Sequence, residues 1–124
     1  MKEFIAIFLG SGLGGILRYS LSKWVDKWFN HHFPFGTFLV NILACFILGL
    51  VIGLAEHRQL LSPNAKMFLA VGFCGGFSTF STFSSENLNL LQNGNHLSAI
   101  FYIFGSVIIC VIACFLGIIT ADWI

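Results

Sequence analysis

The sequence predicts an all-α membrane protein with four transmembrane helices, and three observations lead to this fold class. Of its 124 residues, 57% are hydrophobic and only 9% are charged, whereas a soluble domain carries about 25% charged residues. The mean hydropathy is +0.90. Four largely apolar stretches are long enough to approach the roughly 20 residues that a helix needs to cross the hydrocarbon core. We therefore expect one transmembrane domain over residues 1–124, surrounded by membrane lipid.

The four helices are expected at approximately residues 3–25, 35–55, 66–92 and 97–121. Arg18 falls near the polar end of the first span, where a long side chain can reach water. The start of this span is weakly basic, so we interpret it as a helix and not as a signal peptide. Pro34 and Glu56 bound the second span, and Lys66 precedes the third. Residues 93–95 read Asn-Gly-Asn, which is typical of a turn.

Positive charge is divided equally between the two sides of the membrane. Four helices that run up and down place both termini on the side of the 56–66 connection. Near the helix ends, the basic residues of that side are Lys2, Arg58 and Lys66, and those of the other side are Arg18, Lys23 and Lys27. This balance gives no preferred orientation. It predicts insertion both ways and an antiparallel homodimer, although an accidental balance remains the alternative.

Several function classes are excluded or disfavoured by composition. The net charge is +1 and no run of like charges occurs, so no nucleic-acid partner is expected. The four cysteines lie inside apolar stretches without metal-type spacing and are interpreted as small packed side chains; they are Cys45, Cys74, Cys110 and Cys114. The four histidines lie in connecting segments, without partners spaced for a metal or a nucleophile; they are His31, His32, His57 and His96. An enzyme is therefore not expected.

The third span has an unusual composition for a helix in lipid. Residues 72–86 read GFCGGFSTFSTFSSE. Gly75 and Gly76 weaken the helix at mid-membrane, and the nearby hydroxyl groups can bond to carbonyls that a break would free. We expect a break between residues 75 and 79. Beyond it, phenyl rings and hydroxyl groups each recur every three residues, which predicts two parallel tracks; ordinary packing is the alternative.

Asn41 is the only amide or ionisable side chain in the second span. It serves either as a hydrogen bond between helices or as a donor that faces a pathway. A pathway lined by neutral donors and by the positively polarised edges of phenyl rings favours an anion. A small, strongly hydrated anion needs such close neutral donors to replace its water.

Three ordered motifs carry a resemblance to a known family. They are GGILRY at residues 14–19, GTFLVN at residues 36–41 and GFCGGFSTFSTF at residues 72–83. Over its whole length the chain resembles the Fluc (CrcB) fluoride channels. The resemblance implies an antiparallel, dual-topology homodimer in the bacterial inner or plasma membrane. It further implies two fluoride pores, a buried central sodium ion, and export that lowers cytoplasmic fluoride.

The resemblance also implies roles for individual residues. Asn41 would be the polar residue of the fluoride pore, and Phe80 and Phe83 would turn their ring edges toward the ion. Ser81 and Thr82 would belong to the hydroxyl track.

Further roles follow from the same resemblance. The backbone carbonyls of Gly75 and Ser78 would bind sodium, and Arg18 matches a position near the aqueous vestibule of the pore. Tyr102 and Ser106 would reach the pore or support the two rings.

Two other classes are alternatives to the channel. A small dual-topology multidrug transporter needs a membrane carboxylate, and Glu86, at the end of the third span, is the only candidate. A non-transporting assembly protein would need only small residues at four-residue spacing, as in Gly10 with Gly14 or Gly49 with Gly53. Such pairs predict close helix contacts, within one chain or between two.

Overall fold

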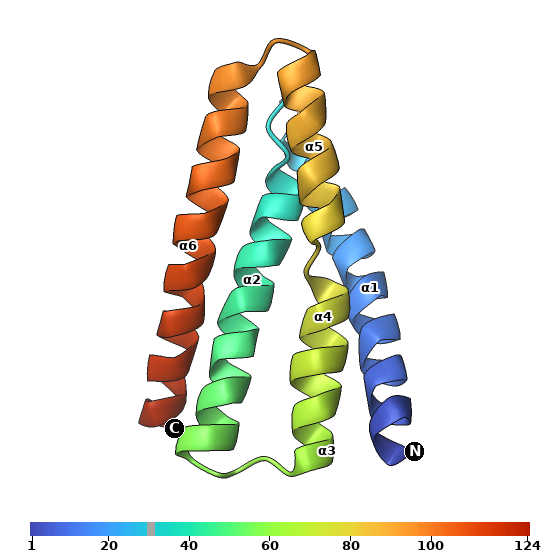
Figure 1. Cartoon of the computed structure of the whole chain (residues 1–124), viewed down its shortest axis with the longest axis vertical. Coiled ribbons are helices and arrows are strands. Elements are labelled where there is room, and N and C mark those ends of the chain that lie inside the picture. The colour runs from blue at the N-terminus through green and yellow to red at the C-terminus, as the bar shows by residue number, and fades with distance from the viewer. Residues whose placement is uncertain (30–31) are drawn as a thin grey trace.

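The computed structural model describes residues 1–29 and 32–124, so His31 and its expected place in a polar connection lie outside the described residues. In this part of the chain, four helices are long and apolar enough to cross a membrane. They stand side by side, with the third between the first and the second (Figure 1). The first two are α1 (Lys2–Trp28) and α2 (Phe35–Ile52), which continues into the π-helical segment η1 (Gly53–His57).

The third crossing is made of several segments and is interrupted. The segments are α3 (Pro63–Lys66), the π-helical η2 (Met67–Cys74), α4 (Gly75–Phe77) and α5 (Phe80–Gln92). Ser62 caps its beginning, because its hydroxyl accepts from the Ala65 amide at 3.2 Å. Ser78 and Thr79 have extended backbones, with ψ of 160° and 118°. The expected break is thus confirmed, and it lies just beyond the two glycines.

The fourth crossing is α6 (His96–Trp123), which follows a tight turn. Gly94 adopts φ +78° in this turn, a conformation that glycine reaches without strain. Both termini and the 58–62 connection lie at one end of the molecule, and the turn at Gly94 lies at the other (Figure 1). The up-and-down arrangement assumed for the charge count is therefore correct.

Glycines bring the helices of one chain into close contact. A Cβ atom on Gly49 would meet the Cys114 carbonyl, and one on Gly14 would meet the Phe73 carbonyl. The first contact joins α2 to α6, and the second joins α1 to the third crossing. The four-residue spacing of these small residues therefore serves packing within the chain, a point that the sequence left open.

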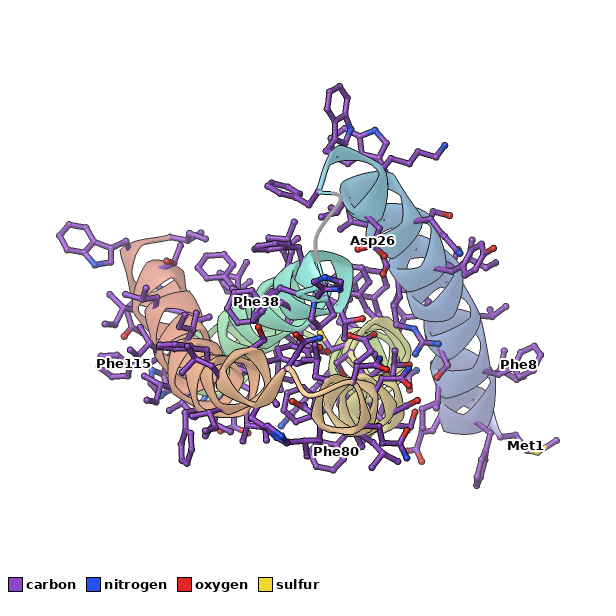
Figure 2. All side chains as sticks on the ribbon, turned by 90° about the horizontal axis from the view of Figure 1, so that it is seen from above. Met1, Phe8, Asp26, Phe38, Phe80 and Phe115 are labelled. Carbon is purple, nitrogen blue, oxygen red and sulfur yellow. The ribbon has the colours of Figure 1, made fainter. Side chains whose placement is uncertain are left out.

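Large apolar side chains cover the outside of the molecule. Phe8 on α1 and Phe115 on α6 point outward from opposite edges, and Phe80 also projects from the surface (Figure 2). The interior is made of smaller residues and a few aromatic rings, among which Tyr102 and Val40 are fully buried. This distribution fits a protein whose solvent is lipid.

Candidate functional site

The break in the third crossing is held by the side chain of Asn41. Its Nδ2 donates to the Thr79 carbonyl at 3.2 Å, and its Oδ1 accepts from the Thr79 amide at 2.8 Å. The Asn41 side chain thereby forms hydrogen bonds with both the amide and the carbonyl of Thr79. The bilayer core contains no water that could form such bonds. The interhelical hydrogen bond considered for Asn41 is present, and it is made to the backbone.

Two backbone amides near the break donate to side chains and not to the helix. In an uninterrupted helix the amide of Thr79 would donate to the Gly75 carbonyl, and the amide of Thr82 to the Ser78 carbonyl. The Thr79 amide instead donates to Asn41, and the Thr82 amide donates to Thr79 Oγ1 at 3.2 Å. The carbonyls of Gly75 and Ser78 thus lose the donors that a regular helix would give them.

A cavity of about 230 Å³ opens beside the break and is shared by α2, the third crossing and α6. It is lined by Asn41, Cys45, Ser78, Thr79, Phe80, Phe83, Ser106, Val107 and Cys110. Sequence reasoning named five of these residues, from three different helices, and the fold brings them together. We call this space the central cavity.

The walls of the central cavity combine phenyl rings with polar groups. The rings of Phe80 and Phe83 lie 5.6 Å apart between centroids and are tilted by 37°. Phe80 is 79% exposed, so the cavity is bordered on its outer side by a ring that its own chain leaves largely uncovered. Ser106 is only 6% exposed, and its Oγ has no hydrogen-bond partner among the described residues. A buried hydroxyl without a protein partner is unusual, and this one can donate to a molecule in the cavity.

Tyr102 supports Phe83 through ring contact. It is fully buried on α6, and its ring meets that of Phe83 edge-on, at 4.8 Å between centroids and 64° between planes. Its hydroxyl donates to Glu86 Oε2 at 3.1 Å, and the hydroxyl of Thr37 donates to the other carboxyl oxygen. Tyr102 does not line the central cavity itself.

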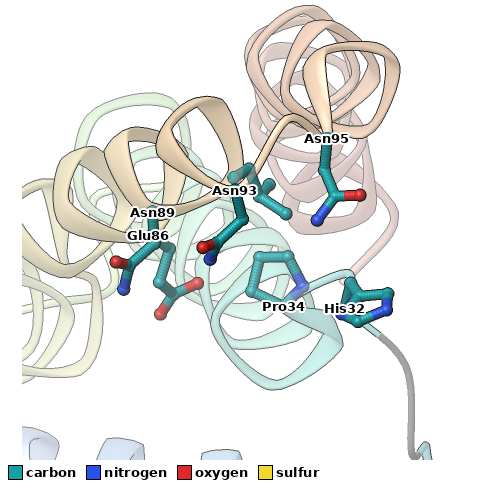
Figure 3. Close-up of a pocket in the computed structure, with 7 residues that line it drawn as sticks. His32, Pro34, Glu86, Asn89, Asn93 and Asn95 are labelled. Carbon is teal, nitrogen blue, oxygen red and sulfur yellow. The ribbon is translucent and has the colours of Figure 1, made fainter.

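Sequence reasoning did not place Thr37 and Glu86 in the site. The sequence suggests Glu86 only as the carboxylate of a drug transporter, although its position three residues after Phe83 puts it on a neighbouring face of α5. Glu86 also lines a cavity of about 290 Å³ near the end of the molecule, together with His32, Pro34, Asn89, Leu90, Asn93 and Asn95 (Figure 3). A cavity with mostly polar lining therefore begins at Glu86, about one helical turn beyond Phe83 on α5.

Arg18 lines a different space. A cavity of about 200 Å³ lies between α1, α2 and α5, and Arg18, Tyr19, Ser22, Lys23, Asp26, Thr37, Thr79 and Thr82 surround it. Thr79 borders both this cavity and the central one. Its hydroxyl also donates to Thr82 Oγ1 at 3.0 Å and lies 3.3 Å from Ser81 Oγ, so the hydroxyl groups form a connected series.

Several known proteins are similar to this chain over nearly its whole length. The family described as CrcB-like protein, Camphor Resistance (CrcB) matches residues 5–118. A protein of Flavobacterium psychrophilum named Fluoride-specific ion channel FluC is 43% identical over 121 residues, which cover 98% of each chain. Proteins of the same name are 42% identical in Chlorobium chlorochromatii, covering 98% of this chain and 93% of the relative, and in Geotalea daltonii, covering both chains completely.

These similarities extend over all four helices and the three motifs, and they exclude the drug transporter and the assembly protein as readings of the fold. The chain belongs to the CrcB/FluC family of fluoride-specific ion channels.

Proposed function

We propose that this chain conducts fluoride through the central cavity and exports it, so that cytoplasmic fluoride falls. The observation that carries the proposal is the convergence of Asn41, Phe80, Phe83 and Ser106 on one cavity beside a helix break. These residues come from three helices. Each offers an anion a hydrogen-bond donor or a positively polarised ring edge, which ordinary packing does not require.

The donors of the cavity are neutral and partly unused. Asn41 has two N–H groups and donates one contact to the Thr79 carbonyl, which leaves the second for an anion. Ser106 offers its unpartnered hydroxyl, and the rims of Phe80 and Phe83 carry partial positive charge. Neutral donors replace the water of a small anion without binding it so tightly that it cannot leave.

The polar spaces on either side supply an approach to the cavity. The cavity of Arg18 serves as an aqueous vestibule, where the guanidinium raises the local concentration of anions. The connected hydroxyl groups of Thr79, Ser81 and Thr82 lead from that vestibule toward the break. Tyr102 holds the ring of Phe83 in place from the opposite side.

An antiparallel homodimer completes the pathway. Hydroxyl groups on α5 are exposed at a depth where lipid would otherwise surround them; they belong to Ser81, Thr82, Ser84 and Ser85. Polar surface in a membrane span is normally covered by protein or lines a water-filled space. A second copy in the opposite orientation covers this face and the exposed ring of Phe80. The equal numbers of basic residues at the two ends permit both orientations.

Sodium is proposed at the centre of the dimer. The carbonyls of Gly75 and Ser78 lack their helical donors, and two chains would contribute four such oxygens. Hard oxygen ligands without a carboxylate suit a monovalent cation, which also offsets the unfavourable burial of unpaired carbonyls.

The direct test is ion efflux from liposomes that contain the purified full-length protein. We expect fluoride to leave rapidly and chloride to be retained. Equal efflux of both ions, or efflux of neither from a folded protein, contradicts the proposal. Proton-coupled efflux of a cationic dye serves as a negative control, because it is the activity of the transporter class.

A further inference from the structure

Two cysteines face each other across the contact between α2 and α6. These helices run in the same direction (Figure 1), and the glycines fix their register. Gly49 lies against Cys114, and Gly53 lies against Ile118, four residues further along both helices. The same step in the other direction places Cys45 opposite Cys110. The two thiols are close enough to interact with each other, and both residues line one cavity.

The thiol pair opens into the central cavity. Both Cys45 and Cys110 line it, beside Asn41, Phe80 and Ser106. Ser106 lies one helical turn before Cys110, and its buried hydroxyl has no partner among the described residues. The pair therefore has an accessible space on one side and a free hydrogen-bond donor close by. Sequence spacing could not reveal this pair, because its members are 65 positions apart (110 minus 45).

We propose that Cys45 and Cys110 form a two-coordinate binding site for a thiophilic divalent cation of the Hg²⁺ type. Soft thiolate ligands select soft metal ions, and two sulfur atoms satisfy an ion that prefers linear coordination. Binding forms two S–Hg bonds and releases one proton from each thiol to water. The product is neutral, because the charge of the cation equals that of the two thiolates.

The surroundings favour this neutral product. Among the described residues, the lining of the central cavity holds no charged side chain that could balance a charged complex, and a neutral complex needs none. The hydroxyl of Ser106 can donate a hydrogen bond to a metal-bound sulfur, the kind of outer contact that stabilises metal sites. The other two cysteines do not line the central cavity. Cys74 lines a cavity of about 140 Å³ that Cys45 also borders, and the backbone of Cys114 lies against Gly49.

Occupancy of the site should stop ion flow, and this consequence rests on the proposed function. The metal would occupy part of the cavity that Asn41 and the phenyl rings line, within the space assigned to fluoride. Block by Hg²⁺ should therefore depend on Cys45 and Cys110 and be reversed by an excess of a small dithiol.

The binding test uses full-length protein in liposomes and HgCl₂ as the probe. In the background Cys74→Ser with Cys114→Ser, only the proposed pair remains. We expect intact-mass measurement to show one mercury and the loss of two protons, and both thiols to become unreactive toward a maleimide together. Uptake of two mercury ions, one on each thiol, or of none, overturns the site.

A second measurement follows fluoride efflux at increasing HgCl₂. Cys45→Ser or Cys110→Ser should raise the concentration needed for block by at least about tenfold, whereas Cys74→Ser or Cys114→Ser should not. Unchanged block in both pair variants overturns the site. One mercury on two thiols without block supports the metal site and instead contradicts the assignment of the central cavity to fluoride.

Discussion

Asn41 on α2 and Thr79 in the break of the third crossing exchange two hydrogen bonds, of 3.2 Å and 2.8 Å. A single side chain thus replaces the helical bond that the Thr79 amide gives up and also donates to the carbonyl of the same residue. Because the same amide lines the central cavity, the residue that stabilises the break also presents a donor to the space beside it. Structural and ion-binding roles of Asn41 are therefore physically linked.

Replacing Asn41 with Asp should damage both roles. The carboxylate can still accept from the Thr79 amide, but it offers no N–H to the Thr79 carbonyl or to an anion. We expect the free energy of unfolding to fall by about 1–3 kcal/mol and fluoride efflux to be lost. Thermal unfolding in detergent and liposome efflux measure the two effects, with Asn64→Asp on exposed α3 as the control for added charge. A folded Asn41→Asp channel with parental efflux would show that the donor is dispensable.

Replacing either phenyl ring of the central cavity with isoleucine tests the ring edges. Phe80→Ile and Phe83→Ile keep apolar volume, so stability should change by less than about 1.5 kcal/mol. Efflux should fall by on the order of tenfold, which corresponds to about 1.4 kcal/mol in the barrier, because isoleucine offers no positively polarised rim. Phe104→Ile, on a 62% exposed ring of α6, is the matched control and should conduct normally. Normal fluoride efflux in Phe80→Ile and Phe83→Ile, as in the control, would show that the two rings serve only packing.

A methyl group at Gly49 should separate α2 from α6. The added Cβ would meet the backbone carbonyl of Cys114, which cannot move without shifting its helix. We expect Gly49→Ala to lower the free energy of unfolding by about 1–3 kcal/mol. Gly105→Ala, where no atom lies within 4 Å of the new Cβ, should instead be neutral or stabilising by up to about 1 kcal/mol. Equal melting temperatures for both variants would contradict the packing argument.

Added positive charge at one end should bias the topology. Leu60→Lys with Asn64→Lys places two lysines at the end that holds both termini, and this end should then stay in the cytoplasm. If function needs both orientations, efflux should fall and recover when an oppositely biased variant, with lysines near residue 94, is expressed in the same cell. Labelling of a cysteine at position 94 from each side of the membrane reports the orientation. Single-sided labelling of the parent protein would rule out dual topology.

Removal of sodium should affect the dimer before it affects the fold of each chain. Elemental analysis of protein purified in sodium and then freed of unbound salt should find one sodium ion per dimer. Prolonged exchange into a large organic cation should leave the carbonyls of Gly75 and Ser78 unpaired, and efflux should fall until sodium is restored. Full activity in protein shown to contain no sodium would refute this site.

The sequence by itself determined the membrane class, the four crossings and the segment, residues 75–79, in which the third crossing breaks. Hydropathy and charge are properties of local segments, and lipid leaves a chain few choices beyond helices. Gly75 and Gly76 marked a weak point, because glycine lowers helix stability wherever it stands. Asn41, Phe80 and Phe83 could be singled out because polar groups and regular aromatic spacing are unusual in such segments.

Only the tertiary structure decided which of these residues meet. The break falls at Ser78 and Thr79, after the glycines, because Asn41 reaches the backbone there from another helix. Arg18 and Thr82 line a separate cavity. The ring of Tyr102 packs edge-on against the ring of Phe83. Cys45 lies close to Cys110. Such contacts depend on the register of packed helices, which is set by close approach at glycines such as Gly49, and no local pattern in the sequence encodes that register.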